Sequence, residues 1–351
     1  MAKGERTYQF KALTDLWTGS VILEEKNGQI REKTVPNRLI ATGLLGSIRW
    51  WFEVLVRGLG GNACDPTNTK CEGWNHCAVC ELFGCTGWAR KFRFEVMDGN
   101  SGTETDQIKQ TQTFILRFTP LRPIRDEEWA LLDATLRLIA DYGAIGGKTV
   151  FKPTDEASRE SEVHHQDYGI VEIVKVEPPI KKLNVTELKR YACEARWMKP
   201  EPKGKDTDFS WASLKHFWFV GEKILSRKNT SSSSFNKVLG RKESKVCHDC
   251  GRVHNPPNKC PNTQKHPKRE SEHLVDCNDE ISKWLAGSQQ ESKKIFSFKN
   301  PARTFGFVKP GLVSFNDMKG RLSGVWGKNG WEFLTGDRIM EKLFTVEEPR
   351  S

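Results

Sequence analysis

The amino-acid sequence predicts an α+β protein with two domains, and three observations lead to this prediction. The chain has 351 residues, which is long for one domain and ordinary for two. Hydrophobic residues make up 37% of the chain, which is enough for packed cores and excludes disorder throughout. Segments with the two-residue alternation of strands are interspersed with segments whose apolar residues recur every three or four positions, as in amphipathic helices.

The N-terminal half contains the clearest pattern. A helix is expected to begin after Thr42 as its N-cap, with Leu44, Ile48 and Phe52 on its apolar stripe, and to end at Gly60. A second helix is expected at 126–142. Strands are expected at 7–13, 39–41, 92–96, 113–118 and 169–176. The main elements follow the order strand, helix, strand, strand, helix, strand, which is the split β-α-β, ferredoxin-like arrangement.

The C-terminal half is predicted to form a second α+β domain, whose strand order is not legible from the pattern. Pro178-Pro179 marks the boundary, so the domains are expected at 1–177 and 178–351. Residues 226–280 are polar, basic and rich in cysteine, and we expect them to be an insertion rather than core. A helix is expected at 185–197 and extended or apolar segments at 214–220, 295–298 and 304–308.

The charge distribution indicates a polyanionic partner. The formal net charge is +10, and residues 221–270 contain 12 basic and 4 acidic side chains. Each phosphate that a basic side chain neutralises adds salt-dependent affinity, although a solvated basic loop is the alternative. No apolar run approaches the ~20 residues of a membrane span, and the N-terminus lacks the apolar core of a signal peptide. We therefore expect a cytoplasmic protein without a membrane partner.

The cysteines form two candidate zinc sites. Ten cysteines are too few for a disulfide scaffold, so thiols or metal ligands are expected. Cys77 and Cys80 have the two-residue gap that lets two thiolates face one ion, and Cys64 and Cys71 complete a tetrahedral set. A second site is expected in the polar insertion, where a structural metal would compensate for the missing apolar core. Its candidate ligands are Cys247, Cys250, Cys260 and His266. Free thiols are the alternative at both sites, and no other cofactor is required.

The sequence indicates no catalytic residues. The first histidine is His76, so the segment before it offers no imidazole for proton transfer. The glycine loop at 143–149 follows a helix and lacks the glycine spacing of a nucleotide-binding P-loop, but such a loop can hold a phosphate through main-chain N–H groups. The strand at 303–308 partly resembles the base-stacking strand of RNA-recognition sheets, with an ordinary buried strand as the alternative.

Three motifs of the N-terminal half resemble the RAMP proteins of CRISPR systems. They are Thr-Asp-Leu-Trp-Thr-Gly at 14–19, Ala-Thr-Gly-Leu-Leu-Gly-Ser-Ile-Arg-Trp-Trp at 41–51 and Cys-Ala-Val-Cys-Glu-Leu-Phe-Gly-Cys-Thr-Gly-Trp at 77–88. The last motif, with Ala-Arg-Lys-Phe-Arg-Phe at 89–94, is similar to the first subunit of Cmr-type, type III-B, effector complexes. The resemblance covers roughly residues 7–152.

This resemblance implies tandem ferredoxin-like (RRM-like) domains and a non-catalytic, RNA-binding subunit of an antiviral ribonucleoprotein. The implied partners are CRISPR RNA, single-stranded target RNA or both, and the other Cmr subunits. Two further hypotheses stay open: a metal-independent endoribonuclease that processes CRISPR RNA, and a purely structural adaptor.

The residues predicted to contact RNA are basic or lie beside accessible backbone. The helix N-terminus at Thr42 presents unpaired N–H groups to a phosphate. Arg49 is expected on the polar side of the first helix, where pairing with Glu53 is the alternative. Strand alternation places Lys91 and Arg93 opposite the neighbouring phenylalanines. The full set is Arg38, Thr42, Ser47, Arg49, Arg90, Lys91, Arg93, Lys148, Lys152 and Arg303.

Overall fold

The computed structural model describes residues 4–19, 21–26, 29–34, 38–64, 71–146, 165–199, 209–226, 233–240, 280–287 and 292–344. The chain divides into two compact units, the first comprising 1–149, 167–219 and 334–351 and the second comprising 150–166 and 220–333. No helix within the described segments is long and apolar enough to cross a membrane.

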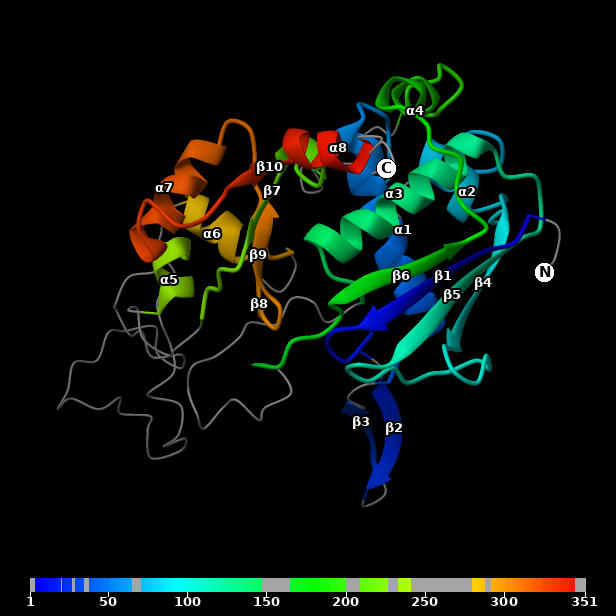
Figure 1. Cartoon of the computed structure of the whole chain (residues 1–351), viewed down its shortest axis with the longest axis horizontal. Coiled ribbons are helices and arrows are strands. Elements are labelled where there is room, and N and C mark those ends of the chain that lie inside the picture. The colour runs from blue at the N-terminus through cyan, green and yellow to red at the C-terminus, as the bar shows by residue number, and fades with distance from the viewer. Residues whose placement is uncertain are drawn as a thin grey trace, which may run out of the picture. The chain divides into compact units, whose positions relative to one another are not determined.

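The first unit is built on a four-stranded sheet with the order β4-β5-β1-β6 (Figure 1). Strand β1 (Arg6–Ala12) pairs antiparallel with β5 (Thr113–Pro120) and with β6 (Val171–Glu177). Strand β4 (Phe92–Asp98) pairs antiparallel with β5. A hairpin that the sequence pattern did not predict, β2 (Val21–Lys26) and β3 (Gln29–Thr34), follows β1 in the chain.

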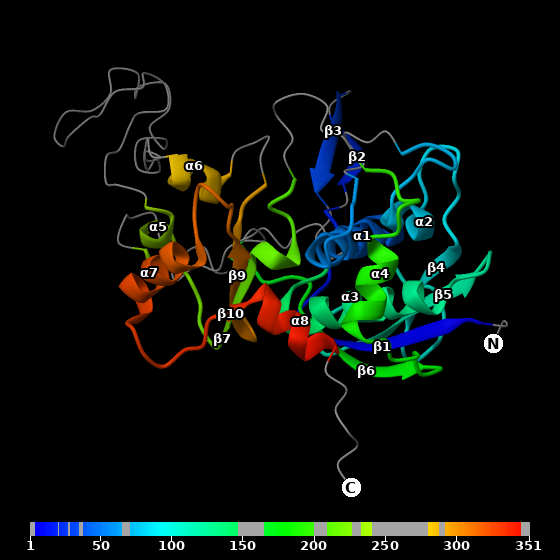
Figure 2. The ribbon, with the colours of Figure 1, turned by 90° about the horizontal axis from the view of Figure 1, so that it is seen from above.

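Two long helices, α1 (Ala41–Gly58) and α3 (Asp126–Tyr142), lie over one face of this sheet (Figures 1 and 2). Tyr8, Phe10 and Phe118 are fully buried, while the residues between them along each strand are more exposed. Helices α1 and α3 therefore cover the aromatic face of the sheet and not its polar face. The predicted order of strand, helix, strand, strand, helix, strand is present, and α3 has its predicted bounds.

The start of α1 differs from the prediction. Residues 38–40 do not form a strand and Ala41 already belongs to the helix, so the strand predicted at 39–41 is wrong. The N-cap residue is Ile40 rather than Thr42. The Ile40 N–H donates to Thr18 Oγ1 at 2.8 Å, so a side chain distant in the sequence accepts a backbone N–H at the start of the helix. No local sequence pattern reveals such a partner.

The glycine loop after α3 packs against α1. Trp51 donates from Nε1 to the Ala144 carbonyl at 2.9 Å, and the Gly146 N–H donates to Ser47 Oγ at 3.0 Å. A Cβ atom at Gly143 would lie 2.6 Å from Cζ2 of Trp51, so the close approach of loop and helix requires glycine there. The end of this loop, including Lys148, lies outside the described residues.

The second sheet has the order β10-β7-β9-β8. Its strands are β7 (Phe217–Gly221), β8 (Ile295–Lys299), β9 (Ala302–Phe307) and β10 (Leu334–Thr335). When the four strands of each sheet are numbered by their order in the chain, the second sheet reads 4-1-3-2 from β10 to β8. The first sheet also reads 4-1-3-2, from β6 to β4. The two sheets thus have the same strand order.

The aromatic strand β9 is buried. Phe305 stacks on Phe296 and Phe298 of β8, with ring centroids 5.1 and 5.8 Å apart. These three rings, Phe307 and Arg303 are all buried. The structure therefore agrees with the ordinary buried strand, which was the alternative to a base-stacking surface at 303–308.

Part of the predicted insertion at 226–280 is core. Residues Ser234–Leu239 form α5, whose Phe235, Val238 and Leu239 are buried, and the side chain of Ser233 accepts the Asn236 N–H as N-cap. The expectation of a segment without core is wrong for these residues, because three apolar side chains in one short helix suffice to anchor it. Residues 227–232 and 241–279 lie outside the described residues. The second unit also contains α6 (Glu280–Ala286) and α7 (Phe315–Trp326).

The compact units differ from the domains expected at 1–177 and 178–351. Helix α4 (Val185–Ala192), the 3₁₀ turn η2 (Leu214–His216) and helix α8 (Gly336–Phe344) all belong to the first unit. Helix α4 packs against α3, and α8 packs against η2. The chain therefore stays in the first unit past Pro178-Pro179 and leaves it only at residue 220.

Two glycine substitutions test the packing of α1 against the glycine loop. Gly143→Ala places a methyl group against the Trp51 ring, and we expect it to lower the free energy of unfolding by about 1–3 kcal/mol. Gly46→Ala, on the exposed side of α1, places a methyl group with no atom within 4 Å. It should raise the free energy of unfolding by up to about 1 kcal/mol, because alanine has the higher helix propensity. Urea unfolding of both variants measures the difference, and equal midpoints would contradict this packing.

Candidate metal centre and predicted RNA contacts

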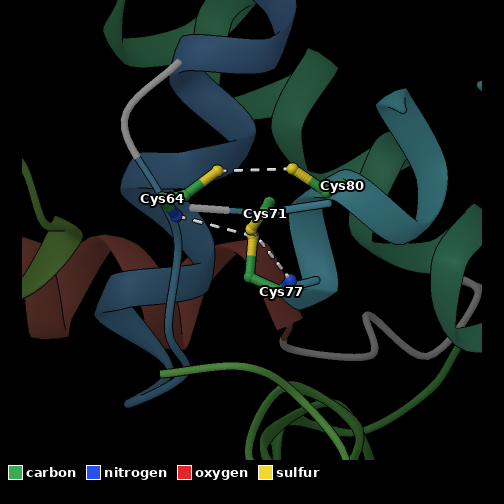
Figure 3. A group of neighbouring side chains, drawn as sticks. All are labelled: Cys64, Cys71, Cys77 and Cys80. Atoms are coloured by element: carbon green, nitrogen blue, oxygen red, sulfur yellow. Dashed lines mark hydrogen bonds between the residues drawn. The ribbon is translucent and has the colours of Figure 1, made fainter. Parts of the chain in front are cut away.

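Four cysteines that are far apart in the sequence converge on one buried point. Cys64 follows α1, Cys71 and Cys77 precede the short helix α2 (Ala78–Phe83), and Cys80 lies within α2. All four are buried, none forms a disulfide, and their sulfur atoms lie within 4.8 Å of one another. Figure 3 shows the four side chains meeting between α1 and α2. The first predicted cysteine set is thus assembled by the fold.

The local backbone holds these sulfurs in place. Cys77 is the N-cap of α2, so Cys80 follows it by one helical turn. The Cys64 N–H donates to Cys77 Sγ at 3.4 Å, and the Cys77 N–H donates to Cys71 Sγ at 3.3 Å. Such bonds stabilise the negative charge of a thiolate. The backbone therefore favours the ionised form in which a cysteine binds a metal.

The thiols share protons with one another. A hydrogen bond with Cys71 lowers the pKa of Cys64 to about 7, and a hydrogen bond with Cys64 lowers the pKa of Cys77 to about 6. The hydrogen bond with Cys64 raises the pKa of Cys80, because a thiol that acts as the hydrogen-bond donor is stabilised in its protonated form. A zinc ion would take the place of these shared protons.

The geometry fits a four-sulfur zinc site. Zn–S distances of about 2.3 Å in a tetrahedron separate the sulfurs by about 3.8 Å. Cys64 Sγ and Cys80 Sγ are 3.3 Å apart, and every pair lies within 4.8 Å. Four protein ligands leave no open coordination position, so the ion would be structural and not catalytic. Among the described residues, this set is the one group of cysteine, histidine and acidic side chains with such a geometry.

Arg49 lies against the cysteine cluster and not on the protein surface. Its Nη2 donates to Cys80 Sγ at 3.2 Å and to Cys64 Sγ at 3.7 Å, and its Nη1 donates to the Gly84 carbonyl at 2.9 Å. Nε donates to Glu53 Oε1 at 3.1 Å, as in the alternative prediction. The expected exposure of Arg49 is wrong, because the cysteine loop covers the polar side of α1. The guanidinium would offset the negative charge of the thiolates in a metal-bound centre.

Lys91 is also buried, in an ion-pair network. Its Nζ lies 2.6 Å from Glu81 Oε1 and donates to both oxygens of Glu128, at 2.7 and 3.0 Å. Glu128 is fully buried and also accepts the Tyr191 hydroxyl at 2.8 Å. The expected surface position of Lys91 is wrong. Lys91 precedes β4, and the two acidic partners come from α2 and α3, which strand alternation does not indicate.

His76 completes this network. Its Nδ1 donates to the Gly73 carbonyl at 2.6 Å, and its Nε2 lies 2.7 Å from Glu81 Oε2. Burial opposes the ionisation of Glu81, but the hydrogen bonds from Lys91 and His76 outweigh it and lower the pKa of this carboxyl below its ordinary value. Glu81, Glu128 and Tyr191 were missed by sequence reasoning, since only the fold brings them to Lys91.

The remaining predicted RNA contacts have different positions. Arg93 is exposed on β4 and pairs with Glu95 at 2.8 Å, and the exposed Arg38 pairs with Asp106 at 3.4 Å. Thr42 is exposed in the first turn of α1, and Arg90 is half-buried. Ser47 contacts the glycine loop, and Arg303 is buried. The predicted residues Lys148, Lys152, Cys247, Cys250, Cys260 and His266 lie outside the described residues.

Part of the chain matches a known protein family. Residues 9–151 match the model of the RAMP superfamily, which confirms the predicted resemblance to RAMP proteins over this segment. No curated protein matches the chain.

Solved structures resemble the chain loosely. The apo form of Cmr1 from Pyrococcus furiosus is 10% identical with a TM-score of 0.40, covering 95% of this chain and 99% of that one. A chain of the type III-B Cmr-beta complex bound to cognate target RNA is 11% identical with a TM-score of 0.42, covering 97% and 99%. At these values the similarity assigns no function to this chain.

The candidate metal centre predicts bound zinc in the purified protein. We expect Cys77→Ser and Cys80→Ser each to lose about one zinc ion per chain, as measured by elemental analysis. Loss of a structural metal costs upwards of about 4 kcal/mol, so the melting temperature should fall by about 8 °C or more. Zinc release should increase as the pH falls, because protons compete for the thiolates. Cys193→Ser, at an exposed cysteine outside the cluster, is the control, and equal zinc in all four proteins would exclude the site.

The buried network predicts a stability role for Lys91. Lys91→Met leaves the fully buried Glu128 without its cation, and we expect a loss of about 3–5 kcal/mol in the free energy of unfolding. Arg93→Ala, which removes an exposed pair, should change it by less than about 0.5 kcal/mol. Thermal denaturation compares the two. A Lys91→Met variant that melts like the wild type would mean that Lys91 has no such role.

Proposed function

We propose that this chain is a non-catalytic, RNA-binding subunit of a type III-B, Cmr-like CRISPR effector complex that acts in the cytoplasm. The match of residues 9–151 to the RAMP superfamily carries the proposal, because this segment includes α1, α3 and three strands of the first sheet. The proposed partners are CRISPR RNA, single-stranded target RNA or both, and neighbouring Cmr subunits.

The proposal includes two ferredoxin-like domains in tandem. The common strand order 4-1-3-2 of the two sheets supports it. In the first unit the two crossover helices are α1 and α3. In the second sheet, α5 and α6 lie between β7 and β8 in the chain, and α7 lies between β9 and β10. This order of elements supports a split β-α-β plan for both sheets.

The polar face of the first sheet is the proposed RNA surface. Arg93 pairs across the strands with Thr119, and Arg117 pairs with Glu95 and with Thr7. These residues lie on the face opposite the buried aromatic side chains. On β1, β4 and β5 this face has no aromatic side chain. RNA binding there would therefore depend on phosphates and would tolerate changes of sequence.

The position of His76 supports a non-catalytic role. Both of its ring nitrogens are engaged inside the protein, with Gly73 and with Glu81, so this imidazole is not placed to transfer a proton to RNA. The four-cysteine centre likewise leaves no open position for a reacting oxygen.

Arg93 and Arg338 provide a matched test of the RNA surface. Both are exposed and both pair with a glutamate, at 2.8 and 2.9 Å. We expect Arg93→Ala to weaken binding of the full chain to single-stranded RNA equally for different sequences, and to reduce the salt slope by about one contact. Arg338→Ala, on α8, should change neither. Filter binding across a range of salt concentrations measures both quantities.

Three results would overturn the proposal. Affinity that does not fall as salt rises excludes phosphate-dominated binding. Protein-dependent cleavage of repeat RNA in the presence of EDTA indicates a metal-independent ribonuclease. A chain that joins other Cmr subunits but never binds RNA, alone or in the complex, is a structural adaptor.

A further inference from the structure

Trp74 is the most exposed large apolar side chain of the described residues. Its side chain is 86% exposed, compared with 63% for Leu121, the next in order. Tryptophan has a large apolar surface and is highly buried in most proteins. An exposed ring of this size is informative, because most of its apolar surface is not buried by the fold.

The backbone that carries Trp74 is rigidly held. Trp74 lies between two of the cluster cysteines, Cys71 and Cys77, at the tip of a tight turn. The backbone N–H groups of Glu72 and Asn75 donate to each other's carbonyl oxygens, both at 3.0 Å, and the Gly73 N–H donates to Thr86 at 2.9 Å. The exposed ring is therefore presented by an ordered turn and not by a loose loop.

Trp88 supports the ring from one side. The two ring centroids are 4.7 Å apart at an angle of 63°, an edge-to-face contact. Trp88 itself is occupied: the Arg122 guanidinium lies 4.3 Å from its centroid and the His76 ring lies 4.6 Å from it. Trp88 thus positions its neighbour, and Trp74 is the ring that remains open to solvent.

The charge around these rings favours a nucleic acid over an apolar peptide. The Arg122 guanidinium contacts Trp88, so a cation accompanies the aromatic pair. Glu72, on the turn itself, is the opposing acidic residue. A solvent-exposed ring with an adjacent guanidinium group is the arrangement on which unpaired bases stack while their phosphates meet the cation.

We infer that Trp74 is a stacking site for one unpaired base of single-stranded RNA, held in position by Trp88 and by the four-cysteine centre. The inference rests on the proposed RNA-binding function and adds a second site to it. The sheet surface contacts phosphates, whereas Trp74 contacts a base. Stacking on an aromatic face tolerates any base, so the site is expected to accept all four.

Three substitutions of Trp74 separate stacking from simple apolar contact. The probes are single-stranded oligoadenylate and an abasic oligomer of the same backbone and length. Trp74→Ala and Trp74→Leu should each weaken oligoadenylate binding by about 5- to 140-fold, while Trp74→Phe retains most of the affinity because the aromatic face is kept. The abasic oligomer should bind all four proteins equally, and the salt slope should not change.

Because the ring is exposed, the three variants should melt with the wild type and keep its zinc content, which shows that the turn is intact. Trp74→Ala binding oligoadenylate as tightly as the wild type would overturn the inference, as would Trp74→Leu binding as well as Trp74→Phe. Loss of assembly with other Cmr subunits, with RNA affinity unchanged, would identify Trp74 as a protein contact. Failure of the proposed function is distinct, because then the wild type itself binds neither probe.

Discussion

The guanidinium of Arg49 is the group that ties α1 to the cysteine centre. It bonds two of the four sulfurs, the Gly84 carbonyl and Glu53. A buried cation is tolerated only where its partners offset the loss of hydration. Burial raises the pKa of Glu53 to about 8, although Arg57 and Arg49 oppose the shift. The cysteine sulfurs therefore supply acceptors for the guanidinium beside Glu53.

A second buried set of charges extends this constraint across the first unit. Lys91 joins α2 and α3 through Glu81 and Glu128, and Tyr191 adds α4. His76 lies next to Cys77 in the chain and bonds Glu81, so the network begins at the cysteine cluster. Such networks fix geometry more than they add stability, because each member is costly only when a partner is missing. The polar groups thus hold the elements on which the RNA surface is proposed.

The sequence predicted what depends on periodicity. The bounds of α3 were correct, as were the strands β4 and β5 to within a few residues, because alternation and helical stripes are local properties. The Cys77–Cys80 spacing likewise indicated one cysteine cluster. Arg49 and Lys91 were misplaced for one reason: a charged residue on the polar side of an element is expected in solvent unless another segment covers it. The covering segments here come from residues 30–40 positions away, at Cys80 and Glu128, and no local pattern reports them.

The proposed division between sheet and turn has a physical basis. Phosphates are the same in every nucleotide, so arginines on a flat polar face bind them without reading sequence. Every base likewise has a π-face, so one aromatic ring accepts any base. A guide-dependent complex requires this tolerance, since base pairing reads the sequence. The turn at Trp74 is already ordered by backbone hydrogen bonds and by the flanking cysteines. Ordering it before RNA arrives removes an entropic cost from binding.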